Sequence, residues 1–151
     1  MEEQQNETYL SVWLNGQLYC LAAQYVVQIM AVPEIVPVPE FPPYAYGVAN
    51  IRNEIVPVLS TRKLLGMPHG EFDGRTCVIF ASVQGRQVGF VVDSVYEVCT
   101  IDNSQMLPVP AVGGVQYRFV DGMCKQKDTI LLRLAVDSML SPDELAQLDL
   151  K

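Results

Sequence analysis

The only histidine of this 151-residue chain, His69, is the first side chain to consider for acid–base chemistry. A serine or cysteine nucleophile usually needs a histidine base, but His69 directly follows Gly66-Met67-Pro68, which predicts an exposed loop. The glycine-rich phosphate-binding motifs and the Gly-x-Ser-x-Gly motif of hydrolases are absent from the sequence. These features predict a protein that is not an enzyme and that holds no cofactor.

Metal binding would require closely spaced cysteine, histidine or carboxylate ligands. The sequence contains no Cys-x-x-Cys pair, and its cysteines are far apart. In a reducing compartment such cysteines remain thiols and fill small spaces in a core. We therefore predict no metal site, and we expect four free thiols, at Cys20, Cys77, Cys99 and Cys124.

The carboxylate of Asp93 is a second candidate for chemistry, in the string Phe90-Val-Val-Asp-Ser94. This string resembles the apolar-apolar-Asp-Ser/Thr-Gly signature of aspartic proteases, but residue 95 is valine where the signature requires glycine. Those proteases also need two carboxylates that share a proton, and the residue equivalent to Asp93 in an internal repeat of this chain is Gln24. We therefore expect Asp93 to accept hydrogen bonds at the end of a strand.

Arg52 stands in an otherwise apolar, strand-like segment, Gly47-Val-Ala-Asn-Ile-Arg-Asn-Glu-Ile-Val-Pro-Val58. Its charge must be satisfied by water, by a carboxylate or by another molecule. The residues alone favour an exposed turn arginine that pairs with Glu54 or with water, since such pairs are common and weak. The alternative is binding of a partner's carboxylate or carbonyl groups, which the planar guanidinium suits well.

Strand patterns dominate the elements that must position these residues. Runs rich in β-branched and aromatic residues are joined by short turns, and Asn-Gly between two such runs is a strong hairpin signal. The predicted hairpins are Tyr9–Leu14 with Gln17–Ala22 and Cys77–Val83 with Arg86–Val92. Two more strands are expected to run back after a polar turn: Ile55–Leu59 after Arg52–Glu54, and Thr129–Leu134 after Lys125–Asp128.

The chain also contains an internal repeat. Leu18–Ile29 aligns without gaps with Gln87–Val98 at an offset of 69 residues. Gly47–Leu65 aligns in the same way with Gly122–Leu140 at an offset of 75 residues. Two long matches in the same order predict two similar β subdomains.

Each half carries about five short strands with turn signals between them, which is typical of a small barrel. We predict a mainly β fold in which two five-stranded barrel subdomains pack on a shared hydrophobic core, because a sheet this small gains stability from a second one. The expected segments are a disordered lead-in at 1–7, a first subdomain at 8–70, a second at 71–140 with interleaving of strands allowed, and a C-terminal helix at 141–151.

Helices are few. Arg62–Leu65, ended by Gly66, predicts a short helix that Ser60 or Thr61 caps. Ser141-Pro-Asp-Glu144 is the start of a second helix, with a capping box. The apolar stripe of this helix is expected to pack on the body of the protein, with binding of a partner as the alternative, and it consists of Leu145, Leu148 and Leu150.

The segment 32–43 holds five of the ten prolines and cannot be a central strand, because proline lacks the amide hydrogen that a ladder needs. We expect an extended loop that Val36 and Val38 anchor. A polyproline ligand for another domain is the alternative.

Composition limits the function further. Half of the residues are hydrophobic, 18% are charged and the net charge is −7, which argues against sequence-independent binding of nucleic acid. The acidic start Met1–Glu7 is unlike a signal peptide, and no apolar run reaches the roughly 18 residues of a transmembrane helix. We therefore expect a cytoplasmic protein with no nucleic-acid partner and no direct membrane insertion.

Two strings resemble the motifs of a known family. Gly47-Val-Ala-Asn-Ile-Arg52, with Ile55-Val-Pro-Val-Leu59 and Arg62-Lys-Leu-Leu-Gly66, resembles the central motif of the CheW-like family of chemotaxis coupling proteins. Val88-Gly-Phe-Val-Val-Asp93, followed by Val95 and Glu97-Val98, is similar to the second signature of that family. The similar elements run in family order from about residue 8 to residue 140. The resemblance implies two SH3-like barrels around a shared core, in agreement with the repeat.

The resemblance also implies an adaptor. CheW-like proteins join the cytoplasmic tips of chemoreceptors (methyl-accepting proteins) to the regulatory domain of a CheA-type histidine kinase, in arrays on the inner face of the membrane. The receptor's helical hairpin is then expected in a groove between the barrels. The implied groove residues are Arg52 as the main polar contact, Val26, Val95 and Val98 as apolar contacts, and Gln28, where the family often has Glu.

Other interpretations stay open at this point. The chain is also compatible with a β-barrel domain that binds a small ligand, with a relic enzyme domain, and with a regulatory domain of a chemosensory pathway that does not control motility. Several residues depart from the family pattern and imply altered partner choice: Asn53 for a frequent Gly, Ser60 and Ala135 for a frequent Asp, and Arg133 and Asp137 in a usually apolar region.

Overall fold

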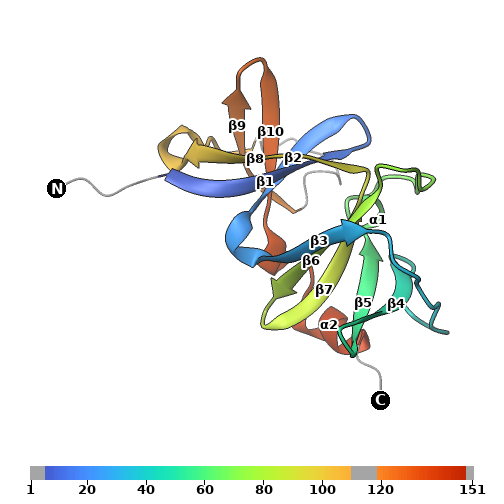
Figure 1. The fold of residues 1–151 in the computed structure, drawn as a ribbon. Helices are drawn as coiled ribbons and strands as arrows, with labels where there is room; N and C mark the ends of the chain where they lie inside the picture. Colours follow the sequence, from blue (N-terminus) through green and yellow to red (C-terminus); the bar gives the residue numbers. More distant parts are fainter. Residues whose placement is uncertain (1–5, 110–118, 149–151) are drawn as a thin grey trace.

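The computed structural model describes residues 6–109 and 119–148, which form two five-stranded sheets, one above the other in Figure 1. Sheet A consists, in spatial order, of β8 (Ser94–Asp102), β1 (Asn6–Leu14), β2 (Gln17–Ala22), β10 (Thr129–Leu134) and β9 (Val120–Gln126). Sheet B consists of β3 (Val26–Ala31), β6 (Cys77–Val83), β7 (Arg86–Val92), β5 (Glu54–Ser60) and β4 (Ala45–Ile51). The predicted mainly β fold with two five-stranded units is confirmed.

The predicted closure into barrels is not confirmed, because neither sheet is closed by a strand ladder over the described residues. β8 and β9 remain as the edges of sheet A, and β3 and β4 remain as the edges of sheet B. The loops that leave β3 and β8 reach the opposite edge of their own sheet through a single bridge each, Val36 with Val48 and Leu107 with Met123. One bridge in place of a strand ladder leaves a gap in the hydrogen-bonded wall.

The two sheets have the same internal order when the halves of the chain are related by the predicted repeat. In that correspondence β1 to β5 match β6 to β10, and each sheet contains one parallel pair, β2 with β10 or β7 with β5. The first hairpin of each half has joined the last three strands of the other half. Each sheet therefore contains strands from both sides of residue 70, where the sequence suggested a subdomain boundary.

The expected disordered lead-in at 1–7 needs a correction at its end. Asn6 and Glu7 belong to β1, where they pair with Asp102 and Ile101 of β8. A long edge strand opposite them extends the ladder toward the N-terminus, which composition alone does not show. Residues 1–5 lie outside the described residues.

The predicted hairpins are confirmed, and their turns explain how this sequence makes them. Asn15-Gly16 joins β1 to β2 and Gln84-Gly85 joins β6 to β7, with all four residues at positive φ. Arg52 and Asn53 join β4 to β5 at φ of 54° and 68°. Two left-handed residues in a two-residue loop match the twist of the flanking strands, and asparagine tolerates this conformation better than most residues.

The residues that the structure describes form three apolar clusters. One lies within sheet A, around Tyr9 and Cys20, and one within sheet B, around Phe80 and Val58. The largest lies between the sheets and takes side chains from both of them, so the predicted shared core is present. Cys20 and Cys124 are buried and Cys77 and Cys99 are half-buried, all as free thiols.

Short helices connect or cover the sheets. α1 (Thr61–Leu64) is capped by Ser60, whose hydroxyl accepts from the Lys63 amide, and α2 (Pro142–Gln147) has the predicted capping box. Leu145 and Leu148 of the α2 region are buried in the shared core, whereas Leu150 lies outside the described residues. The 3-10 turns are η1 (Ala23–Tyr25), η2 (Asn103–Gln105) and η4 (Val136–Ser138). No helix in 6–109 or 119–148 has the length and apolar character needed to cross a membrane.

The proline-rich segment 32–43 is a loop, as predicted, and Val36 anchors it through its backbone. Its amide and carbonyl both bond to Val48, at 2.8 and 2.9 Å, while its side chain stays exposed. Val38 is only half-buried. Gly47, the residue before Val48, allows this approach because a Cβ there would lie 2.1 Å from the Val36 carbonyl oxygen.

Candidate functional site

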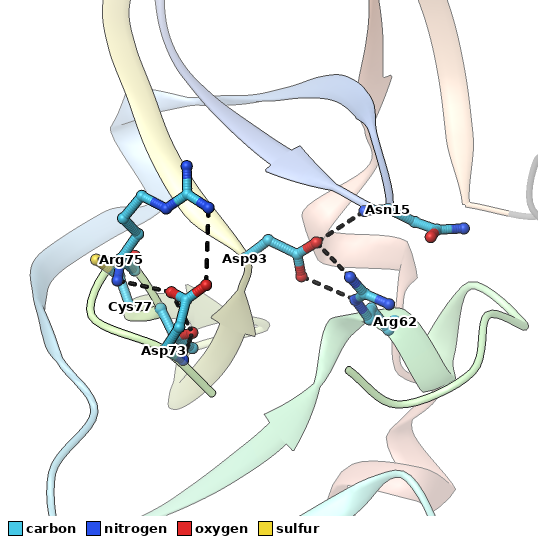
Figure 2. A network of polar contacts seen from close by, with 7 residues as sticks. Asn15, Arg62, Asp73, Arg75, Cys77 and Asp93 are labelled. Atoms are coloured by element: carbon cyan, nitrogen blue, oxygen red, sulfur yellow. Dashed lines mark hydrogen bonds and ion pairs between the residues drawn. The ribbon is translucent and has the colours of Figure 1, made fainter. Parts of the chain in front are cut away.

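Asp93 is a structural acceptor, as the sequence favoured. Arg62 donates to it twice, from Nε at 2.8 Å and from Nη2 at 2.5 Å, and the Asn15 amide donates at 2.9 Å (Figure 2). Burial alone would raise the pKa of this carboxyl, but the hydrogen bonds from Arg62 and Asn15, with the charge of Arg62, hold the pKa below its ordinary value. Three of the roughly four acceptor positions of this carboxylate are therefore occupied by donors from the protein itself.

His69 lies in the predicted loop and is exposed, but it has contacts that the sequence did not suggest. Its Nδ1 is 3.3 Å from the Tyr46 hydroxyl and 3.3 Å from Ser60 Oγ, and its ring packs against Tyr46. Ser60 also caps α1 and is buried. The histidine thus fastens its loop to sheet B. Within the described residues, no group of histidine, cysteine and carboxylate side chains is arranged to hold a metal ion.

Arg52 is exposed in the turn between β4 and β5. Within the described part of the chain it makes no ion pair with Glu54, which was one of the two partners, Glu54 and water, that the residues alone favoured. In the order of sheet B, three strands separate β4 from β3, which carries Val26 and Gln28. Arg52 therefore follows one edge strand of sheet B, whereas Val26 and Gln28 lie on the other edge strand.

The cross-strand partners show which way the remaining predicted residues face, because directly opposite residues share a face of the sheet. Val26 is opposite Ala81, and Val95 is opposite Val12; both partners belong to the core between the sheets. Val98 is opposite Leu10, also of that core, yet it is 66% exposed because β8 is an edge strand.

Gln28 differs from this group. It is opposite Phe80, which belongs to the separate core of sheet B. The reason is an irregularity in the pairing between Val26 and Gln28, which places one extra residue, Val27, in β3. Gln28 consequently points away from the face that Val26 and Val98 share, a reversal that strict alternation along the strand would not predict.

The residues that sequence reasoning missed are Val27, Ile29 and Tyr96. Val27 is 54% exposed and its repeat equivalent Tyr96 is 53% exposed, each at the irregular point of its own edge strand. Ile29, 42% exposed, is the equivalent of Val98 and lies opposite Ile79 of the shared core. The repeat could have identified these residues, since the offset of 69 residues pairs Val27 with Tyr96 and Ile29 with Val98.

We call these four residues the edge pairs: Val27 and Ile29 on β3, and Tyr96 and Val98 on β8. Large apolar side chains that stay exposed in both copies of a repeat are unusual on a surface that only water touches. Tyr96 also packs edge-on against Trp13, with ring centroids 5.8 Å apart, which fixes one end of the set. The edge pairs can offer apolar contact area to another protein.

A sizeable cavity lies elsewhere, between the β4–β5 hairpin, the start of β7 and α2. It has a volume of about 520 Å³, and Ile55, Pro57, Leu145 and Leu148 supply much of its apolar wall. None of the five predicted contact residues lines it. Its wall contains Glu54 and Arg86 but no convergent group of titratable side chains.

Comparison with known proteins gives a consistent result. Residues 8–144 match the family model described as the CheW-like domain. A chemotaxis protein CheW of Rhizobium meliloti (strain 1021) is 30% identical over 80% of this chain and 83% of its own length, and one of Bacillus subtilis (strain 168) is 27% identical over 91% and 88%. A crystal structure of the scaffolding protein TtCheW from Thermoanaerobacter tengcongensis is similar with a TM-score of 0.84 and 25% identity, over 91% of this chain and 94% of that chain.

Proposed function

This chain belongs to the CheW-like family, and from that membership we propose that it is a chemotaxis coupling adaptor that joins chemoreceptor tips to a CheA-type histidine kinase. The relatives named chemotaxis protein CheW and the similar structure of a scaffolding protein support the coupling function. The partners we propose are the cytoplasmic tip of a methyl-accepting receptor and the regulatory domain of the kinase. The place of action would be the cytoplasmic face of the membrane, and the adaptor would carry out no chemical step itself.

The observation that supports the receptor contact is the set of edge pairs. Val27, Ile29, Tyr96 and Val98 expose apolar area on the edge strands β3 and β8. The two of them that have a cross-strand partner, Ile29 and Val98, lie opposite Ile79 and Leu10 of the core shared by the sheets. An amphipathic helix binds such a surface through residues spaced three or four apart. Val26 and Val95, half-buried beneath them, would support the contact, and Gln28 would not take part directly.

Arg52 belongs to a different part of this proposal. It is exposed, holds a left-handed turn and has no ion-pair partner in 6–109 or 119–148, so its guanidinium is available to a carboxylate or carbonyl of a partner. Arg52 follows β4, which is the opposite edge strand of sheet B from β3, and we assign it to a second protein or to a second part of the same one rather than to the helix that contacts the edge pairs.

The test uses two charged variants and two matched controls. We expect Val98→Glu to weaken capture of a receptor cytoplasmic fragment about tenfold or more, because a charge would be buried against apolar side chains. Val36→Glu is the control, since Val36 is also about half exposed but lies on the loop outside the edge pairs. Equal capture by Val98→Glu and the wild type would contradict the receptor contact.

For Arg52 the variant is Arg52→Asp and the control is Lys127→Asp, the equivalent turn of sheet A with φ of 55°. Aspartate tolerates this conformation, so both variants should fold. We expect Arg52→Asp alone to weaken binding of the receptor or of the kinase regulatory domain, measured separately by calorimetry. Unchanged affinity for both proteins would remove Arg52 from the proposed contacts.

A further inference from the structure

A polar link crosses from one sheet to the other at Asp93. This residue lies between β7 of sheet B and β8 of sheet A. Its carboxylate binds Arg62, in α1 directly after β5 of sheet B, and the amide of Asn15, in the β1–β2 turn of sheet A. Its own amide donates to the Trp13 carbonyl at 3.1 Å. Figure 2 shows the Asp93 carboxylate facing both Arg62 and the amide of Asn15.

A second link crosses between the sheets at Asp137. The β6–β7 turn of sheet B supplies Gln84, whose amide donates to Asp137 Oδ1 at 3.1 Å. The Gln84 side chain donates from Nε2 to the carbonyls of Asp137 and Leu140, at 3.1 and 2.8 Å. Asp137 follows β10 of sheet A. The turn of one sheet is again fastened to the segment that leaves the other sheet.

The two links occupy equivalent places in the repeat. Asn15 corresponds to Gln84 at the offset of 69 residues, and Arg62 corresponds to Asp137 at the offset of 75. The chemistry is different, because one link uses an arginine and the carboxylate of Asp93, whereas the other uses the carboxylate of Asp137 directly. A contact that both halves keep with different side chains indicates a demand on the geometry rather than inherited sequence.

The physical need for such links follows from the nature of the shared core. Hydrophobic contact scales with area and is not directional, so it holds two sheets together without defining one angle between them. Charge-assisted hydrogen bonds have preferred distances and directions, and a bidentate arginine–carboxylate pair is the most restrictive kind. Two links at separate points of the seam can therefore define one orientation.

Each link also reaches an edge strand that carries an edge pair. β8 begins at Ser94, directly after Asp93. β3 pairs with β6, whose turn carries Gln84. We infer that Asp93 and Asp137 are positioning residues that fix the orientation of sheet A relative to sheet B, and through it the spacing of the edge pairs. The statement about the spacing of the edge pairs rests on the proposed function, whereas the statement about the orientation of the sheets does not.

The test measures orientation without any partner. Backbone residual dipolar couplings are recorded for the double variant Asp93→Ala/Asp137→Ala, and one alignment tensor is fitted to each sheet. We expect the wild type to require a single common tensor and the double variant to require two. The matched control is Asp121→Ala, which removes the 2.7 Å pair with Arg133 inside sheet A and should keep the common tensor.

A common tensor in the double variant overturns the inference. If that variant does not fold, the milder pair Arg62→Lys/Gln84→Ala removes the bidentate contact and the side-chain bonds and is judged by the same criterion. Receptor-fragment affinity is measured in parallel, and we expect it to fall about fivefold with the tensors separated. Separate tensors with unchanged affinity support the orientation and overturn its coupling to the edge pairs. Absence of any binding by the wild type contradicts the proposed function alone.

Discussion

At Asp93, opposing effects on one carboxyl group determine how it contributes to the fold. Burial raises its pKa, and the bonds from Arg62 and Asn15 outweigh that effect and lower it. Asp93 and Arg62 line a cavity whose wall also contains Glu71, Asp73 and Arg75, so charges of both signs surround it. The ionised form is the one that the folded protein prefers.

This preference predicts an acid-sensitive contribution to stability. Because the folded-state pKa lies below the unfolded one, ionised Asp93 stabilises the fold fully above the unfolded value, and this stabilisation is lost as the pH falls through the folded value. We expect the difference in free energy of unfolding between wild type and Asp93→Asn to be constant above about pH 5 and to shrink below about pH 4. Urea titrations at several pH values measure it. A difference that grows on acidification would contradict the assignment.

At the scale of elements, one glycine decides whether the proline-rich loop can reach β4. Gly47 has φ of 147° and faces the Val36 carbonyl so closely that no side chain fits. Among the described residues, the bridge from Val36 to Val48 is the only backbone pairing at the outer edge of β4. The position therefore combines a rare backbone conformation with a close backbone approach.

We predict that Gly47→Ala lowers the free energy of unfolding by about 2–4 kcal/mol, because both the conformation and the contact must change. Gly16→Ala is the control. Gly16 also has positive φ, 81°, but a Cβ there meets no atom within 4 Å, so only backbone strain of about 1 kcal/mol is expected. Chemical denaturation measures the free energy of unfolding of both variants. Equal losses would show that the approach of Val36 contributes nothing.

At the scale of the whole molecule, the core between the sheets makes them one folding unit. It contains Leu10, Leu14 and Tyr19 from sheet A together with Leu59 and Phe90 from sheet B. Neither sheet could bury this face alone. Loss of packing at one of these positions should therefore destabilise both sheets.

Leu59→Ala tests this coupling. Leu59 is fully buried on β5, and its truncation should cost about 2–5 kcal/mol. Hydrogen exchange should then accelerate in β1 and β2 of sheet A as well as in sheet B, because both open in one cooperative transition. Val56→Ala, in the separate core of sheet B, is the companion variant, and a single cooperative unit predicts that its faster exchange also extends into sheet A. Acceleration confined to sheet B in the Leu59 variant would contradict a single unit.

The sequence by itself determined the local parts of this protein. Hairpins, helix caps, the repeat and the family motifs depend on residues close together in the chain, where turn propensity and alternation act directly. Long-range pairing decided the rest. The exchange of hairpins between halves requires β2 to meet β10 and β5 to meet β7, contacts that no local pattern encodes. One extra residue in β3 reversed the face of Gln28 and exposed Val27, because a shift of one residue moves a strand's side chains to its other face.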